Sequence, residues 1–105
     1  MAIVFWGVKS NYFLPFDAER WKAWEENNER DEELRWKMSS SLLRSERLFG
    51  LQRAEVLGLL GAPLSETENE VNYELGSTGF GMEYGILIIS FDQENHVTKA
   101  VRITH

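Results

Sequence analysis

Residues 84–91 read YGILIISF and form the most strongly β-favouring stretch of the chain. β-Branched and aromatic residues dominate this stretch, which predicts a strand. Apolar residues stand at both parities, so we expect a central strand that is covered on at least part of both faces. Residues 92–95 (DQEN) follow it and favour a hairpin loop that returns the chain antiparallel.

Two further strands are expected on either side of this one. Val71, Tyr73 and Leu75 alternate with polar residues, as in a half-buried strand. Residues 76–81 (GSTGFG) then indicate a turn or loop. Residues 97–103 show a similar alternation after the hairpin loop. Because the connections are short, the three strands are predicted to form an antiparallel meander.

An amphipathic helix precedes the strands. Leu34, Met38 and Leu42 recur every four residues, which is the spacing of one face of an α-helix. We expect this helix to continue until Gly50. The serines at 39–41 are interpreted as polar helix surface. Arg35, Trp36 and Lys37 are interpreted as a helix face whose charged heads reach solvent.

A second, shorter helix is expected after Gln52. Gln52 with Glu55 three residues later makes a weak capping box, and Gly61 is a favourable stop for which we expect a positive φ. The chain is therefore predicted to be α+β in the order α-α-β-β-β. Two helices would pack on one face of a three-stranded antiparallel sheet. The predicted core comprises Met38, Leu42, Val56, Leu60, Leu87, Ile89 and Phe91.

The segment before these helices is rich in aromatic residues. We assign residues 1–16 to an N-terminal arm and residues 17–105 to a single domain. Asp17 is a favourable helix N-cap, so an extra helix is expected to begin there. The apolar residues 1–7 are either an arm that packs on the core or the remainder of a membrane anchor or signal. They do not make a complete signal peptide.

The composition is that of a globular domain with an acidic bias. The 105 residues are 43% apolar with a net charge of −6, and the absence of Cys excludes disulfides and zinc–thiolate sites. No apolar run is long enough to span a membrane. Residues 54–98 contain eight acidic residues and no Lys or Arg. This distribution argues against nucleic-acid binding. The acidic half is either a solvated, solubilising surface or a face that attracts a protein partner with a basic surface.

The sequence contains no recognisable catalytic motif. The serines at 39–41 have no nearby His and no nucleophile elbow. The alternating acids at 66–70 lack the Gly and the frame of a calcium loop. The glycines of 76–81 are not followed by a Lys or a helix, as a phosphate loop would require. We therefore expect no enzyme activity, no cofactor and no metal ion.

Several short motifs together resemble a known family. They are Arg35-x-x-Met38-x-x-x-Leu42, Leu59-Leu60-Gly61-x-Pro63, Tyr73-x-Leu75-Gly76 and Leu87-x-Ile89-x-Phe91-Asp92. Over residues 34–103 the pattern resembles the small α+β domain of the SmpA/OmlA (BamE-like) family. The same two-helix, three-strand unit is similar to the repeat of β-lactamase inhibitor proteins. The resemblance implies a non-catalytic, lipoprotein-like domain of the bacterial cell envelope or periplasm. A cytoplasmic location stays open because no complete signal peptide is present.

We expect the protein to be a non-enzymatic protein-binding or scaffold module. The alternative is a small acidic inhibitor or immunity-type protein that blocks an enzyme or toxin. An interface would combine aromatic residues with a rim of acids. The partner-binding candidates are Phe80, Tyr84 and Tyr73, with Glu70, Glu74 and Glu83. Phe80 is the strongest candidate because it stands between two glycines, whereas Tyr73 also fits an ordinary core residue. The oligomeric state stays open.

Overall fold

The structure of the protein, a computed structural model, describes residues 14–25 and 28–105. Its helices are α2 (Ala18–Lys22), the 3₁₀ helix η1 (Glu29–Asp31), α3 (Leu34–Arg44) and α4 (Arg53–Leu60). Its strands are β1 (Ser65–Glu66), β2 (Glu70–Ser77), β3 (Tyr84–Phe91) and β4 (Val97–Thr104). Most of the predicted arm, residues 1–13, lies outside the described residues. The extra helix expected after Asp17 is confirmed as α2.

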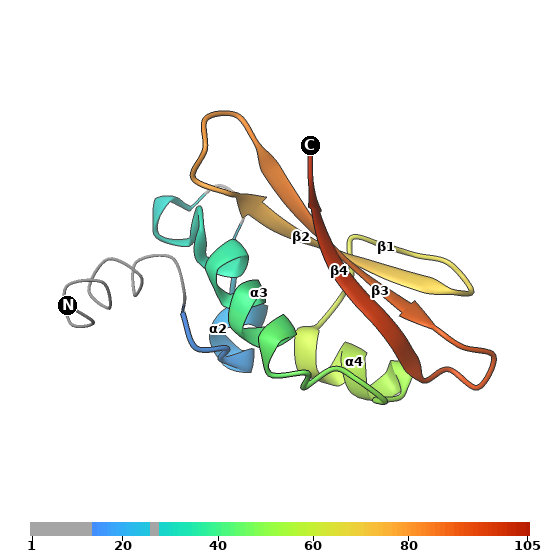
Figure 1. Cartoon of the computed structure of the whole chain (residues 1–105). Helices are drawn as coiled ribbons and strands as arrows, with labels where there is room; N and C mark the ends of the chain where they lie inside the picture. Colours follow the sequence, from blue (N-terminus) through green and yellow to red (C-terminus); the bar gives the residue numbers. More distant parts are fainter. Residues whose placement is uncertain (1–13, 26–27) are drawn as a thin grey trace, which may run out of the picture.

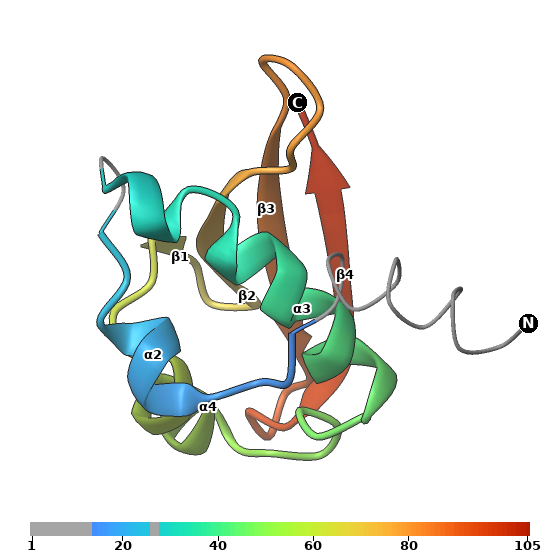
Figure 2. The same cartoon turned by 90° about the vertical axis from the view of Figure 1, so that its left-hand side faces the viewer.

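The strands form one antiparallel sheet in the order β1-β2-β3-β4. The predicted α+β class and the meander of three long strands are confirmed. The two-residue strand β1 was not predicted, because the polar residues around it show no strand pattern. The helices lie on one side of the sheet in both views (Figure 1 and Figure 2). None of the helices among the described residues has the length and apolar character needed to cross a membrane.

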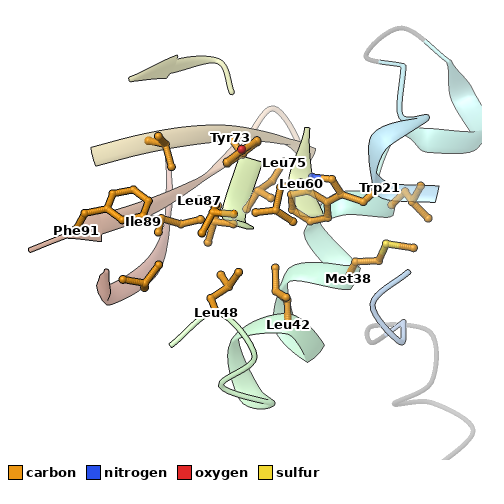
Figure 3. Close-up of a cluster of buried hydrophobic side chains, with 14 residues drawn as sticks. Trp21, Met38, Leu42, Leu48, Leu60, Tyr73, Leu75, Leu87, Ile89 and Phe91 are labelled. Atoms are coloured by element: carbon orange, nitrogen blue, oxygen red, sulfur yellow. The ribbon is translucent and has the colours of Figure 1, made fainter. Parts of the chain in front are cut away.

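The core fills the space between the helices and the sheet (Figure 3). All seven predicted core residues are buried, and none of them is more than 6% exposed. Trp21 of α2 is also fully buried, and its ring packs edge-on against Tyr73 of β2 with 6.4 Å between the ring centroids. The short helix α2 therefore contacts the sheet through a large aromatic pair.

The bounds of α3 and α4 can be compared with the predicted helix bounds. Helix α3 ends at Arg44 and does not reach Gly50. Glu46 has a φ of 56°, a left-handed conformation that interrupts the helix. The predicted start of α4 is confirmed, since the Glu55 carboxylate accepts the backbone N–H of Gln52 at 2.9 Å. Gly61 ends α4 with a φ of 82°, as expected.

Two arginines are held on aromatic rings between the helices and the sheet. The prediction that Arg35 reaches solvent is wrong, because its guanidinium lies between the rings of Trp21 and Trp24 at 4.7 and 4.6 Å. Burial lowers the pKa of Arg35 to about 10. The prediction of a polar surface at 39–41 is also wrong for Ser39, which is fully buried and accepts a hydrogen bond from Arg102. Both errors arose because the burying residues are distant in the sequence.

Strand β3 is the central strand predicted by the sequence, since it pairs with both β2 and β4. Its exposed fractions alternate along the strand, with Leu87 and Ile89 buried and Ile86 and Ile88 half-buried. The half-buried residues agree with the expectation that at least part of the second face is covered. The described helices lie on the side of Leu87 and Ile89 (Figure 1 and Figure 3).

Candidate functional site

The sheet face that points away from the helices carries a row of apolar side chains from β3 and β4. We call it the open face and define it by Tyr84, Ile86, Ile88, Val101 and Ile103. The register places Ile86 opposite Ile103 and Ile88 opposite Val101, so the aliphatic side chains form cross-strand pairs. The most accessible residues of the open face are Tyr84 and Ile103, which are 49% and 46% exposed. Contiguous apolar surface of this kind is typical of an interaction site.

A groove of about 710 Å³ crosses one end of the open face. It begins beside η1, passes over β2 and β3 and reaches His105 after β4. Its walls combine carboxylates with apolar side chains. The charged and apolar side chains of the lining include those of Glu29, Glu32, Leu64, Glu74, Tyr84 and Ile86.

A close approach between the segment after η1 and the edge of β2 builds one wall of the groove. Strand β1 pairs with only the start of β2, and farther along the backbone N–H of Ser77 donates to the Glu32 carbonyl at 3.0 Å. Gly76 has a φ of 74°, and a Cβ there would lie 2.9 Å from the Glu32 carbonyl oxygen. Glycine is therefore required for this approach. The Trp24 indole N–H donates to the Asp31 carbonyl at 2.8 Å and fixes the same segment.

The charge lining the groove is negative. Its carboxylates belong to Glu29, Glu32 and Glu74. Arg35 lies behind Glu74 and donates from Nη1 to the Glu74 carbonyl at 3.0 Å, so its positive charge offsets part of the negative charge of Glu74. Within the described part of the chain, neither Glu29 nor Glu32 forms an ion pair. Both residues are exposed and line the groove.

Five of the six partner-binding candidates lie on or beside this surface. Glu74 and Tyr84 line the groove, and Glu70 stands opposite Ser90 on the open side of the sheet. Phe80 and Glu83 lie in the turn between β2 and β3. Phe80 is 63% exposed, while the Glu83 carboxylate accepts a hydrogen bond from the Thr78 hydroxyl at 3.0 Å.

Tyr73 does not belong to the open face. It is fully buried on the helix side, and its hydroxyl donates to the Gly61 carbonyl at 2.7 Å. Burial raises the pKa of Tyr73 to about 12. The prediction that Tyr73 binds a partner is therefore wrong, and the alternative prediction, that it is a core residue of the strand, is confirmed. The shared parity with Val71 and Leu75 was the signal for this outcome.

Sequence reasoning missed most of the groove lining, including Glu29, Glu32 and Leu64. The first two belong to a polar run before α3, and Leu64 lies in the connection between α4 and β1. No local pattern indicates which connecting segment will lie beside the free edge of β2. The groove is a product of tertiary contacts, above all the hydrogen bond from Ser77 to Glu32.

One group of side chains among the described residues has the geometry to hold a metal ion. Ligand atoms of Asp92, Glu94 and His96 lie within 4.8 Å of one another in the turn between β3 and β4. The Asp92 carboxylate already accepts the backbone N–H groups of His96 at 3.0 Å and of Glu94 at 2.8 Å, and these bonds lower its pKa. The turn explains the cluster, and the expected absence of a metal stays a prediction.

Comparisons with family models, curated proteins and solved structures each found no match. The resemblance to the SmpA/OmlA family therefore stays a prediction, as does the cell-envelope location that it implies.

Proposed function

We propose that this protein is a non-enzymatic binding module that docks a protein partner on the open face of its sheet. The observation that carries the proposal is the row of cross-strand aliphatic pairs, Ile86 with Ile103 and Ile88 with Val101, on a face that no described helix covers. Burying such apolar surface against a partner is the main source of binding free energy.

The charges around the open face favour a basic partner. Glu70 and Glu74 stand on the same side of β2 as the open face, and Glu29 and Glu32 border the groove. Lys99 of β4 is the one basic residue between Arg53 and Arg102. Complementary charges of this kind accelerate association and orient the partner, while the apolar centre supplies affinity.

The turn between β2 and β3 extends the apolar surface beyond the groove. Phe80 and Met82 are 63% and 86% exposed there. Exposed aromatic and Met side chains are enriched where proteins bind one another. We therefore include Phe80 in the proposed interface, next to Tyr84.

The experiment is an affinity pull-down from the native host, followed by purification of the captured partner and measurement of its affinity. Ile103→Ser should weaken binding by about tenfold, because it removes an apolar anchor from the interface. Phe49→Ser is the matched control, since Phe49 is 66% exposed but lies outside the open face, in the connection between α3 and α4. Equal affinities of wild type and Ile103→Ser would refute the proposed surface.

The same experiment addresses the inhibitor or immunity-type alternative. If the captured partner is an enzyme or toxin and loses activity on binding, the module acts as an inhibitor. If the partner keeps its activity, the binding serves a scaffold role. Both outcomes use the open face, so the Ile103→Ser comparison is required in either case.

A further inference from the structure

The groove at the end of the open face is lined by both apolar side chains and carboxylates. Tyr84, Ile86 and Leu64 provide apolar surface, and Glu29, Glu32 and Glu74 provide carboxylates. Among the residues that the structure describes, the lining includes neither Lys nor Arg. Apolar surface next to the exposed carboxylates of Glu29 and Glu32 matches a side chain that has an aliphatic stem and a cationic head.

The nearest buried cation of the chain cannot fill the groove. The Nε and Nη2 atoms of Arg35 donate to the Trp21 carbonyl at 3.1 and 3.0 Å, and its Nη1 donates to the Glu74 carbonyl. Its guanidinium is also held between two indole rings on the helix side of the sheet. Arg35 is thus fixed where it is, and the charges of Glu29 and Glu32 remain available to an external cation.

We propose that the groove binds a lysine or arginine side chain from an otherwise apolar segment of the partner. This inference rests on the proposed function and specifies the partner chemistry at one end of the interface. The stem of the side chain lies along Ile86 and Tyr84, and its charged head lies beside Glu29 and Glu32. The ring of Tyr84 adds a cation–π contact for an arginine head. A groove of about 710 Å³ is large enough for such a side chain with its neighbouring residues.

The test uses three matched peptides in which Val alternates with Lys, Gln or Glu. Their binding to the ¹⁵N-labelled protein is followed through backbone amide shifts at low salt. We expect the Lys peptide to bind about fivefold more tightly than the Gln peptide, and the Glu peptide to bind most weakly. The largest shifts should fall at the amides of Glu29, Glu32, Glu74 and Tyr84.

Two double variants separate a local site from the general negative charge of the protein. E29Q/E32Q should reduce the affinity for the Lys peptide to that for the Gln peptide. The fold is expected to persist, because Glu32 contacts β2 through its backbone carbonyl. E46Q/E94Q removes the same charge from two exposed turns outside the groove and should leave the preference for Lys in place.

The outcomes distinguish this inference from the proposed function. Equal binding of the Lys and Gln peptides, or an equal loss in both double variants, would overturn the groove inference. If the open-face amides of Ile88 and Val101 still shift in that case, the proposed binding surface stands. If the groove prefers Lys but Ile103→Ser binds the purified partner like wild type, the cation site stands and the proposed function fails.

Discussion

Ile88 and Ile89 are neighbours in β3, yet they lie in opposite environments. Ile89 is fully buried beneath the helices, and Ile88 is half-buried on the open face. The pleat of the strand alone sends them to opposite sides of the sheet. Strand β3 therefore has apolar side chains on both faces of the sheet, fully buried under the helices on one face and only half-buried on the other. In our proposal the second face serves a partner.

The charged side chains on the two sides of the sheet also differ in their surroundings. On the helix side, the guanidinium groups of Arg35 and Arg102 stack on indole rings and donate to backbone carbonyls of Trp21, Glu74 and Trp36. At the groove beside the open face, the carboxylates of Glu29 and Glu32 are exposed to solvent. Charges that stabilise the fold are satisfied internally, and charges suited to an external ligand are left accessible.

The largest expected effect is the difference between the two adjacent isoleucines. Ile89→Ala should destabilise the protein by about 2–5 kcal/mol, because it leaves a cavity in the core. Ile88→Ala should cost about 1 kcal/mol or less, because the open face loses only part of a half-buried side chain. Urea denaturation of both variants measures the difference. Similar losses of stability would mean that the two faces are equally buried.

The next effect concerns the buried arginine. Arg35→Ala should cost about 2–4 kcal/mol, because it leaves the Trp21 and Glu74 carbonyls without their donors and removes two ring contacts. Arg35→Lys should recover only part of the loss, since an ammonium group lacks the planar fork. Thermal unfolding of both variants gives the comparison. Full recovery by Lys would contradict the geometry of the stacked guanidinium.

A smaller effect is expected at the end of α4. Gly61→Ala should destabilise by about 1 kcal/mol, because a residue with a Cβ disfavours positive φ. The added Cβ would also lie 3.3 Å from Cγ of Lys22, which must shift slightly. Gly58→Ala is a useful control, as a Cβ at Gly58 meets no atom within 4 Å. If Gly58→Ala lowers the free energy of unfolding as much as Gly61→Ala does, the positive φ of Gly61 does not explain the effect.

The hydroxyl of Tyr73 contributes a comparable amount, with a defined pH dependence. Tyr73→Phe should cost about 1 kcal/mol at neutral pH, because the Gly61 carbonyl loses its hydrogen bond. The pKa of Tyr73 is raised from 10.0 to about 12 in the folded protein, so unfolding releases its proton in this range. The advantage of wild type over Tyr73→Phe should therefore shrink as the pH rises from about 10 to 12. A constant difference across this range would refute the shift.

The smallest effect on stability is expected at the exposed aromatics. Phe80→Ala and Phe49→Ala should each change the free energy of unfolding by less than about 0.5 kcal/mol. Only Phe80→Ala should weaken binding of the purified partner, because Phe80 lies in the turn that joins β2 to β3, whereas Phe49 lies between α3 and α4. Binding that falls equally in both variants would remove Phe80 from the proposed interface.

Local patterns predicted the longer helices and strands, much of the core and the groove residues Glu74 and Tyr84, but not the groove itself. Periodicity predicted the helix that contains Met38 and Leu42 and the strand at 84–91. Backbone preference predicted the helix end at Gly61. The burial of Arg35 depends on Trp21 and Trp24, which are brought to it by the packing of α2. Likewise, Glu29 and Glu32 reach the open face only because their segment contacts the edge of β2. Such long-range contacts leave no local signal in the sequence.

The most direct test of the central claim is the isoleucine δ1-methyl NMR spectrum with and without the purified partner. Ile86, Ile88 and Ile103 report the open face, and Ile89 reports the helix side of the same sheet. Our account predicts that the first three resonances shift or broaden on binding, while Ile89 stays nearly unchanged. Unchanged resonances of Ile86, Ile88 and Ile103 in the presence of bound partner would contradict it.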